Sequence, residues 1–265
     1  LYRWDRMAAE GWAWWAARVQ RMLQQADAFR IDHFRGFAAY FEIPADSPDA
    51  RHGRWRRGPG RALFDALSAA LGPLPIVAED LGLITPDVHA LRAALGYPGM
   101  KVLQYAFGGD AEHDYLPHRY ARGTAAYTGT HDTDTLVGWW RSALEHERRF
   151  AGTYLACGAH DQQDGQGVQG VHWAAIRALC NSVADLVVVP MQDVLGLDSA
   201  HRMNLPGTMG GHNWSWRFDW AMVGDAPGRR LGLITAASGR GNFKLLGLGL
   251  PPKSGPSSYG SPVVE

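Results

Sequence analysis

The sequence predicts an α/β fold of the TIM (β/α)8-barrel type, of which this chain contains only the C-terminal part, about five strand–helix units. Short apolar segments alternate with segments of helical period, as is typical of a parallel sheet covered by helices on both faces. Polar residues follow the apolar segments directly, where strands would end. An open doubly wound sheet fits the same alternation. Because strand ends converge on one active-site face in a TIM-type barrel, the position of these polar residues favours the barrel.

Helical periodicity and end signals predict five helices. Asp5 is predicted to cap the first, in which apolar side chains recur at three- and four-residue spacing from Trp12 to Met22. Gly72 is predicted to end the second, and Thr85 to cap the third. The expected helices cover residues 5–25, 61–71, 85–96, 133–150 and 171–184.

Strands are expected over residues 28–32, 75–78, 100–105, 125–128 and 186–189. Eight units close a TIM barrel, so about three N-terminal units are expected to be missing. The start at Leu1, without methionine or signal-peptide pattern, is interpreted as a chain already in progress. Residues 1–242 are predicted to form the barrel portion, and residues 243–265, rich in Gly, Pro and Ser, an irregular tail. We expect such a fragment to be poorly stable and inactive alone.

Composition narrows the function classes. The chain has 265 residues, 46% of them hydrophobic, with 26 basic and 26 acidic side chains. This balance predicts no nucleic-acid or membrane partner. No apolar run is long enough for a membrane span, and two cysteines are too few for a disulfide framework, which fits a cytoplasmic setting. Eleven tryptophans indicate mainly core packing, with some indoles as platforms for sugar rings.

Two carboxylates follow the first two predicted strands. Asp32 lies two residues after Arg30, so strand alternation places both side chains on one face. A guanidinium favours the charged form of a carboxylate, which suits a nucleophile, although the pattern also fits a purely structural ion pair. Glu79 ends an apolar strand, where partial desolvation favours the protonated form and suits a general acid. An ordinary solvated or paired glutamate is the alternative.

A third carboxylate, Asp132, follows His131 after another strand. Both could bind sugar hydroxyls, or Asp132 or Thr133 could simply cap the following helix. Three acids at three strand ends face a common space, which is the arrangement that glycoside chemistry needs. The sequence has no Walker or dinucleotide-type phosphate loop and no Gly-x-Ser-x-Gly motif.

These motifs resemble those of the amylomaltases and plant disproportionating enzymes, 4-α-glucanotransferases of the α-amylase clan. The likeness runs in order from Leu1 to about Gly241. It is carried by the segments 29–36 (FRIDHFRG), 78–82 (AEDLG) and 127–132 (YTGTHD), supported by 1–4 (LYRW), 98–104 (PGMKVLQ), 190–193 (PMQD) and 202–208 (RMNLPGT).

The resemblance implies a retaining, two-step transfer of α-1,4-glucan segments from a maltodextrin donor to the 4-hydroxyl of glucose or another glucan. It implies that Asp32 is the nucleophile, Glu79 the general acid/base and Asp132 the transition-state stabiliser. No metal or organic cofactor is implied. Arg30, His131, Asn204 and Asn213 are predicted to contact substrate; for His201 and His212, near the mouth of the site, structural roles are at least as well supported.

Three alternatives stay open. The same acids would serve an α-1,4-glucan hydrolase of the same clan, or the chain could be a non-catalytic glucan-binding fragment. A metal-dependent barrel hydrolase could use His33, His131 and Asp132 as ligands, although no typical ligand cluster is visible. The sequence does not predict the oligomeric state or the preferred donor length.

Overall fold

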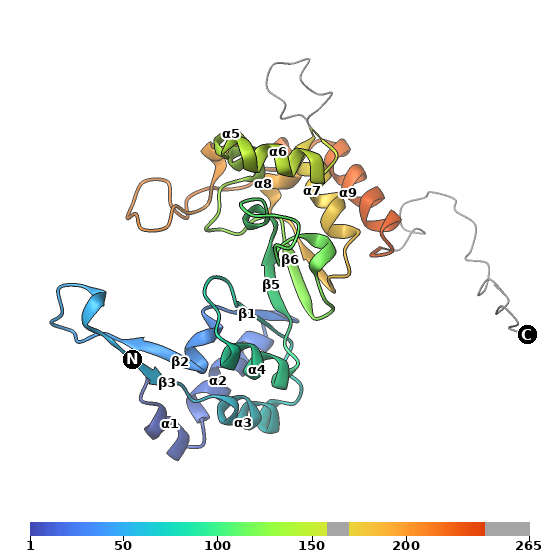
Figure 1. The fold of residues 1–265 in the computed structure, drawn as a ribbon. Coiled ribbons are helices and arrows are strands. Elements are labelled where there is room, and N and C mark those ends of the chain that lie inside the picture. Colours follow the sequence, from blue (N-terminus) through green and yellow to red (C-terminus); the bar gives the residue numbers. More distant parts are fainter. Residues whose placement is uncertain (158–169, 242–265) are drawn as a thin grey trace, which may run out of the picture. The chain divides into compact units, whose positions relative to one another are not determined.

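A computed structural model describes residues 1–157 and 170–241 (Figure 1). The chain divides into two compact units, Leu1–Trp216 and Arg217–Glu265, and each is described by itself. The predicted tail, residues 243–265, lies outside the described residues, so the boundary at 242 stays a prediction.

The first unit contains five short strands that run parallel wherever they pair. The strands are β1 (Phe29–Ile31), β4 (Ile76–Ala78), β5 (Gly99–Val102), β6 (Thr124–Tyr127) and β7 (Leu186–Val188). One ladder joins β1 to β4, and a second joins β5, β6 and β7 in that order. All five predicted strands are therefore present, although the one predicted over 100–105 ends at Val102. Because the pairs are parallel, the residues that follow the strands within each ladder lie at the same edge.

A side chain links the two ladders at the end of β4. The Ala78 amide donates to the Pro98 carbonyl (2.9 Å), and the Met100 amide donates to Oδ1 of Asp80 (2.7 Å). The carboxylate lies so close to Gly99 that a Cβ there would come within 2.5 Å of Oδ2. Asp80 thus replaces part of the backbone ladder between β4 and β5, and the missing side chain at Gly99 gives it room.

Eight α-helices are described in the first unit, and two predicted ones are split. The predicted helix 5–25 breaks at Gly11 and Trp12, both at positive φ (65° and 61°), and the predicted helix 133–150 breaks between Ser142 and Glu145. Asp5 lies inside the first turn and pairs with Arg3 instead of capping. The helices are α1 (Trp4–Ala9), α2 (Ala13–Leu23), α3 (Arg61–Leu71), α4 (Pro86–Leu95), α5 (Leu136–Ser142), α6 (Glu145–Tyr154), α7 (Val171–Cys180) and α8 (Met191–Val194).

The structure adds an antiparallel hairpin between β1 and α3, formed by β2 (Ala39–Glu42) and β3 (Arg54–Arg57). Short 3-10 turns connect other elements: η1 (Phe34–Phe37), η2 (Ala50–His52), η3 (Leu103–Ala106), η4 (Pro117–Arg119) and η6 (Ser199–His201). The described part of the second unit contains η7 (Trp220–Met222) and α9 (Asp225–Ala237), which were not predicted.

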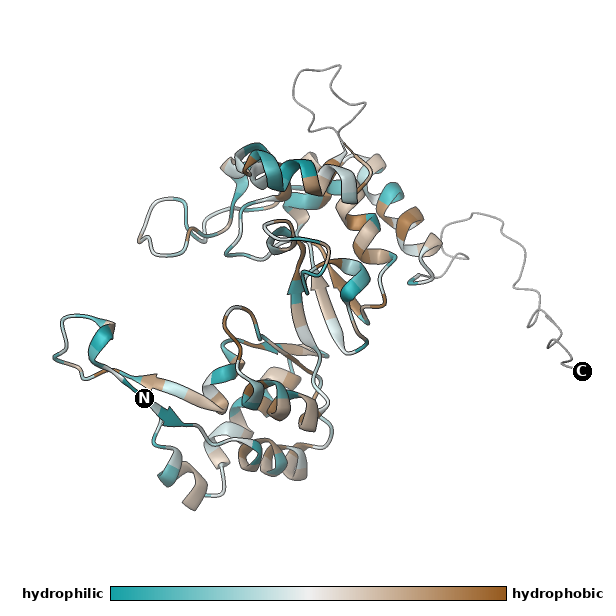
Figure 2. Ribbon diagram, in the orientation of Figure 1, coloured by the Kyte–Doolittle hydropathy of each residue, from teal (hydrophilic) through white to brown (hydrophobic). Residues whose placement is uncertain are grey.

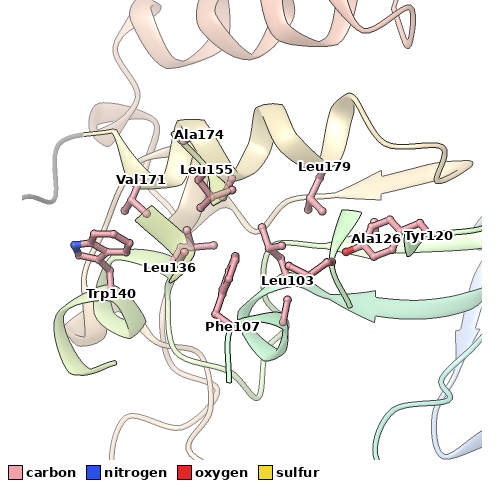
Figure 3. Close-up of a cluster of buried hydrophobic side chains, with 14 of the residues drawn as sticks. Leu103, Phe107, Tyr120, Ala126, Leu136, Trp140, Leu155, Val171, Ala174 and Leu179 are labelled. Carbon is pink, nitrogen blue, oxygen red and sulfur yellow. The ribbon is translucent and has the colours of Figure 1, made fainter. Parts of the chain in front are cut away.

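Two large apolar clusters hold the first unit together, and a smaller one of Val77, Met100 and Ala125 joins β4, β5 and β6. One large cluster packs β1 and β4 against α2, α3 and α4, with Phe34, Leu63, Phe64 and Leu67 fully or almost fully buried. The other large cluster packs β6 against α5, α6 and α7 (Figure 3). Figure 2 shows that α6 is mostly hydrophilic, and its buried contribution is small, centred on Ala151. The helices therefore cover the strands while the strand ends remain free to carry polar groups.

Replacing Leu67 with alanine is expected to lower the free energy of unfolding by about 2–5 kcal/mol, because the cavity left by a fully buried leucine cannot collapse completely. Leu67 is 1% exposed in the cluster under β1 and β4. Ala69→Ser on the exposed side of the same helix is the control and is expected to cost less than about 1 kcal/mol. Urea unfolding of both variants measures the difference, and equal losses would contradict this view of the core.

No helix in the described ranges combines the length and apolar character needed to span a membrane.

Candidate active site

The three carboxylates predicted from the sequence line one cavity of about 550 Å³. Asp32 follows β1, Glu79 follows β4, and Asp132 lies in the loop after β6. The structure thus brings together acids that are far apart in sequence. The cavity is lined by Arg30, Asp32, Glu79, Leu81, Gly82, Tyr105, His113, Tyr115, Thr130 and Asp132.

Asp32 is the most exposed of the three acids, with 75% of its side chain accessible. Its Oδ1 accepts a hydrogen bond from Nη2 of Arg30 at 2.5 Å, so the predicted ion pair is confirmed. Arg30 is held in turn by a contact of its Nε with the Met100 sulfur at 3.2 Å. One carboxylate oxygen of Asp32 therefore faces a fixed cation, while the side chain remains open to the cavity.

Glu79 is oriented by backbone amides on both of its oxygens. Oε2 accepts from the His33 amide at 2.7 Å and Oε1 from the Leu81 amide at 2.8 Å. His33 has a positive φ of 50°, and this left-handed turn after β1 aims its N–H at Glu79. The backbone adds a further link, because the Phe34 amide donates to the Glu79 carbonyl at 3.0 Å. The turn that follows Asp32 thus fixes the carboxyl group of Glu79.

Asp132 is held by a second loop, residues 202–214. Nδ2 of the Asn204 side chain donates to Oδ1 at 2.7 Å, and the Arg202 guanidinium donates to the Asp132 backbone carbonyl at 2.6 Å. Nε2 of His131 lies 3.3 Å from Oδ2, and the His131 ring packs on the indole of Trp214, with centroids 5.1 Å apart. Neighbours thus contact both oxygens of a half-exposed carboxylate.

The capping role considered for Asp132 and Thr133 belongs to another residue. Helix α5 begins at Leu136, and the hydroxyl of Thr135 accepts from the Gly138 amide at 3.0 Å. The Thr133 hydroxyl accepts instead from the Thr130 amide within the loop. The carboxylate of Asp132 remains available to the cavity.

Three cavity residues had no signal in the sequence analysis: Tyr105, His113 and Tyr115. Burial raises the pKa of the Tyr105 phenol, and the nearby negative charges of Asp132 and Glu79 raise it further, although Arg202 lowers it. Burial also raises the pKa of Tyr115. Both phenols therefore keep their protons at neutral pH and can donate hydrogen bonds to a bound molecule.

Of the predicted substrate contacts, only Arg30 lines this cavity; His131 and Asn204 reach it only through Asp132, and the remaining predicted residues also lie outside its lining. The Asn213 side chain braces the 202–214 loop, because its Oδ1 accepts from the Leu205 amide at 2.9 Å and its Nδ2 donates to the Thr208 hydroxyl at 2.8 Å. The ring of His201 faces Asp198 at 3.3 Å. The carbonyl of His212 accepts from the Ser215 hydroxyl at 2.6 Å. Substrate contacts by these residues stay predictions.

Within residues 1–157 and 170–241, no three His, Cys, Asp or Glu side chains are grouped so that they could hold a metal ion. The metal-dependent alternative therefore has no ligand set in that part of the chain.

A parallel α/β sheet with three acids at separate strand ends around one cavity is the class of site used on glycosidic bonds. The chain belongs to the 4-alpha-glucanotransferase family, whose model matches residues 1–222. This confirms the resemblance drawn from the motifs.

Relatives named 4-alpha-glucanotransferase share extensive sequence with the chain. The proteins of Synechocystis and of Thermus thermophilus are each 46% identical to it, over 242 and 243 residues; each match covers 91% of this chain. The matches cover 46% and 48% of those relatives, so the chain spans about half their length.

Solved structures agree with this assignment. The Streptococcus agalactiae amylomaltase, solved in complex with acarbose, superimposes with a TM-score of 0.84 at 33% identity, over 91% of this chain and 47% of that one. The Corynebacterium glutamicum amylomaltase (TM-score 0.65, 20% identity, 79% of this chain and 34% of that one) shares the fold.

Proposed function

We propose that the polypeptide to which this chain belongs is a 4-α-glucanotransferase that moves α-1,4-glucan segments from a maltodextrin donor to glucose or another glucan. The observation that carries the proposal is that Asp32, Glu79 and Asp132 line the same cavity. Family membership supports it, because the matched relatives are named for this activity. The acarbose bound to the Streptococcus agalactiae protein is consistent with a site for glucan-like ligands.

In the first step, a carboxylate oxygen of Asp32 attacks the anomeric carbon and forms a glycosyl ester, while Glu79 gives its proton to the departing glycosidic oxygen. The Arg30 guanidinium, bonded to Asp32, stabilises the negative charge of the nucleophile before attack. The reducing-end part of the donor leaves with the proton from Glu79.

In the second step, the 4-hydroxyl of an acceptor sugar attacks the ester, and the Glu79 carboxylate takes the hydroxyl proton. The new α-1,4 bond forms as the bond to Asp32 breaks, so the anomeric configuration is retained. Asp132 binds sugar hydroxyls and stabilises the positive charge of the transition state, in an orientation fixed by Asn204 and His131. Tyr105 and Tyr115 supply protonated phenols at the same cavity.

The proposal extends to the architecture. The five strands form the C-terminal part of a (β/α)8 barrel, and about three further units close it. The outer strand β7 supports this, because Leu186 and Val188 are 45% and 36% exposed. Beside β1, a cavity of about 480 Å³ is lined mainly by apolar side chains, including Trp4, Trp15 and Phe29. Both places are suited to apolar segments of the same polypeptide.

Product analysis with maltotriose tests the proposal. The full-length polypeptide, meaning this chain together with the closing units, is expected to give glucose and a series of longer maltodextrins. The chain alone is expected to give neither, because its barrel is open. Only glucose and maltose from the full-length polypeptide would identify a hydrolase, which is the alternative that the same three acids would serve. Binding without any product would identify a non-catalytic glucan-binding protein.

A further inference from the structure

A buried carboxylate behind the site, Asp193, bonds to both ends of the loop that carries His131 and Asp132. It lies in α8, the short helix that begins three residues after the end of β7, and is 1% exposed. Oδ2 accepts from the Thr128 hydroxyl at 2.5 Å, and Oδ1 accepts from the Leu136 amide at 2.7 Å. Thr128 is the first residue after β6, and Leu136 is the first residue of α5. One side chain thus closes the loop 129–135 at its base.

The loop lacks regular backbone pairing with any strand, so its shape depends on side chains. Gln104, which is also buried, donates from Nε2 to the Asp134 carbonyl at 2.8 Å. Ser199 donates to Oδ2 of Asp134 at 2.6 Å. These contacts hold the C-terminal half of the loop, but only Asp193 bonds to both ends among the contacts of the described residues.

The burial of Asp193 makes these two hydrogen bonds hard to replace. Desolvation raises the pKa of the carboxyl group, whereas the Leu136 amide and the Thr128 hydroxyl lower it, and the nearby charge of Asp134 raises it. If the loop moved away, the carboxyl group would be left buried without its donors, which strongly disfavours such a movement. The carboxylate therefore favours one shape of the loop.

We propose that Asp193 is a positioning residue of the transferase: it fixes the 129–135 loop and thereby sets the place of Asp132 at the reacting sugar. Asp193 does not line the cavity that holds the three acids. It lines a smaller cavity of about 140 Å³ with Thr130 and His131, but it is 1% exposed, so it acts through the loop and not on the substrate. A misplacement of a reacting-site group by about 1 Å can slow a reaction about 100-fold. This inference rests on the proposed function for its kinetic test, but the loop's shape can be measured without activity.

The matched control is Asp185, which makes a similar bond at the other end of the same two strands. Its Oδ2 accepts from the Gly123 amide at 2.6 Å, just before β6, and Asp185 itself directly precedes β7. Asp193→Asn and Asp185→Asn both remove a carboxylate that links these strands. Only Asp193 bonds to the ends of the loop with Asp132, so only Asp193→Asn is expected to affect that loop.

In the full-length polypeptide, Asp193→Asn is expected to lower kcat for maltotriose about tenfold or more, with KM changed less than about threefold. Asp185→Asn is expected to leave kcat within about twofold of the parent. Thr128→Val, which removes the hydroxyl, is expected to lower kcat like Asp193→Asn, and Thr128→Ser, which keeps it, to retain most of the activity. The Thr128 pair decides the question if Asp193→Asn does not fold.

A second readout follows the His131 ring by NMR in histidine-labelled protein, with its resonance identified by its loss in His131→Gln. Asp193→Asn and Thr128→Val are expected to shift or broaden this resonance, and Asp185→Asn to leave it unchanged. Unchanged kcat and an unchanged resonance in both Asp193→Asn and Thr128→Val would overturn the inference. If the parent has no transferase activity, the proposed function fails, and the His131 resonance alone still decides whether Asp193 positions the loop.

Discussion

Asp32→Ala in the full-length polypeptide is expected to lower kcat for maltotriose disproportionation about 10⁴-fold, because the covalent glycosyl intermediate can no longer form. The fold is expected to survive, since the side chain is 75% exposed and its hydrogen-bond partner is Arg30. Loss of an exposed ion pair costs at most about 1 kcal/mol. Initial rates of glucose release and thermal unfolding of the same preparation measure both effects.

Asp5 supplies a matched control for this variant. It pairs with Arg3, two residues earlier, at 3.1 Å, as Asp32 pairs with Arg30, but it does not line the cavity. Asp5→Ala is expected to keep kcat within about twofold. A near-normal rate in Asp32→Ala would contradict the assignment of the nucleophile, and an equal loss in both variants would point to a general effect of removing such pairs.

Glu79→Gln is expected to lower kcat for maltotriose about 10³- to 10⁴-fold, because the amide cannot protonate the departing oxygen. A donor whose leaving group departs without protonation separates the role of Glu79 as general acid from a structural role. With α-glucosyl fluoride, the first step needs no acid, so formation of the glycosyl ester is expected to fall far less than with maltotriose. The burst of fluoride release in the first turnover measures this step.

The control for Glu79 is its neighbour Asp80. Both carboxylates follow β4 and accept hydrogen bonds from backbone amides. Asp80, however, accepts from Met100 in β5 and so links β4 to β5, and it does not line the cavity. Asp80→Asn is expected to lower the melting temperature. Its kcat, measured well below that temperature, is expected to stay close to that of the parent. If Glu79→Gln lowered the rate equally with maltotriose and with the fluoride donor, this would argue against Glu79 as the general acid.

The parallel strands and the helix α3 could be predicted from the sequence because their signals are local. A short apolar run marks each strand, and Gly72 ends α3 where predicted. The break between α1 and α2 could not be predicted in this way. The apolar spacing continues through it, because Trp4 and Met7 before the positive φ values and Trp15 after them all pack in the same cluster.

The hairpin of β2 and β3 shows a different limit. All four residues of β3 are exposed, so the alternation of buried and exposed side chains that marks a strand is absent. Its pairing with β2 comes from the chain reversal between them, and Glu42 bonds to Arg54 and Arg56 across the pair. Such an exposed strand leaves no apolar pattern in the sequence.

The candidate site was predictable where a carboxylate directly follows a strand, as Asp32 and Glu79 do. Tyr105 was missed because the strand was predicted to run to residue 105. In the structure β5 ends at Val102, and the turn η3 carries Tyr105 to the cavity. Tyr115 and His113 lie in a loop without periodic signal, and only the fold brings them to the acids.

The claim that three acids act on one glycosidic bond is tested most directly by intact-protein and peptide mass spectrometry after reaction with 5-fluoro-α-glucosyl fluoride. The full-length polypeptide and its Glu79→Gln variant are expected to gain one fluoroglucosyl group, located on the peptide that contains Asp32. Asp132→Ala is expected to gain it much more slowly, because the charge of the transition state is no longer stabilised. A label on another residue, or equally fast labelling of Asp132→Ala, would contradict the account.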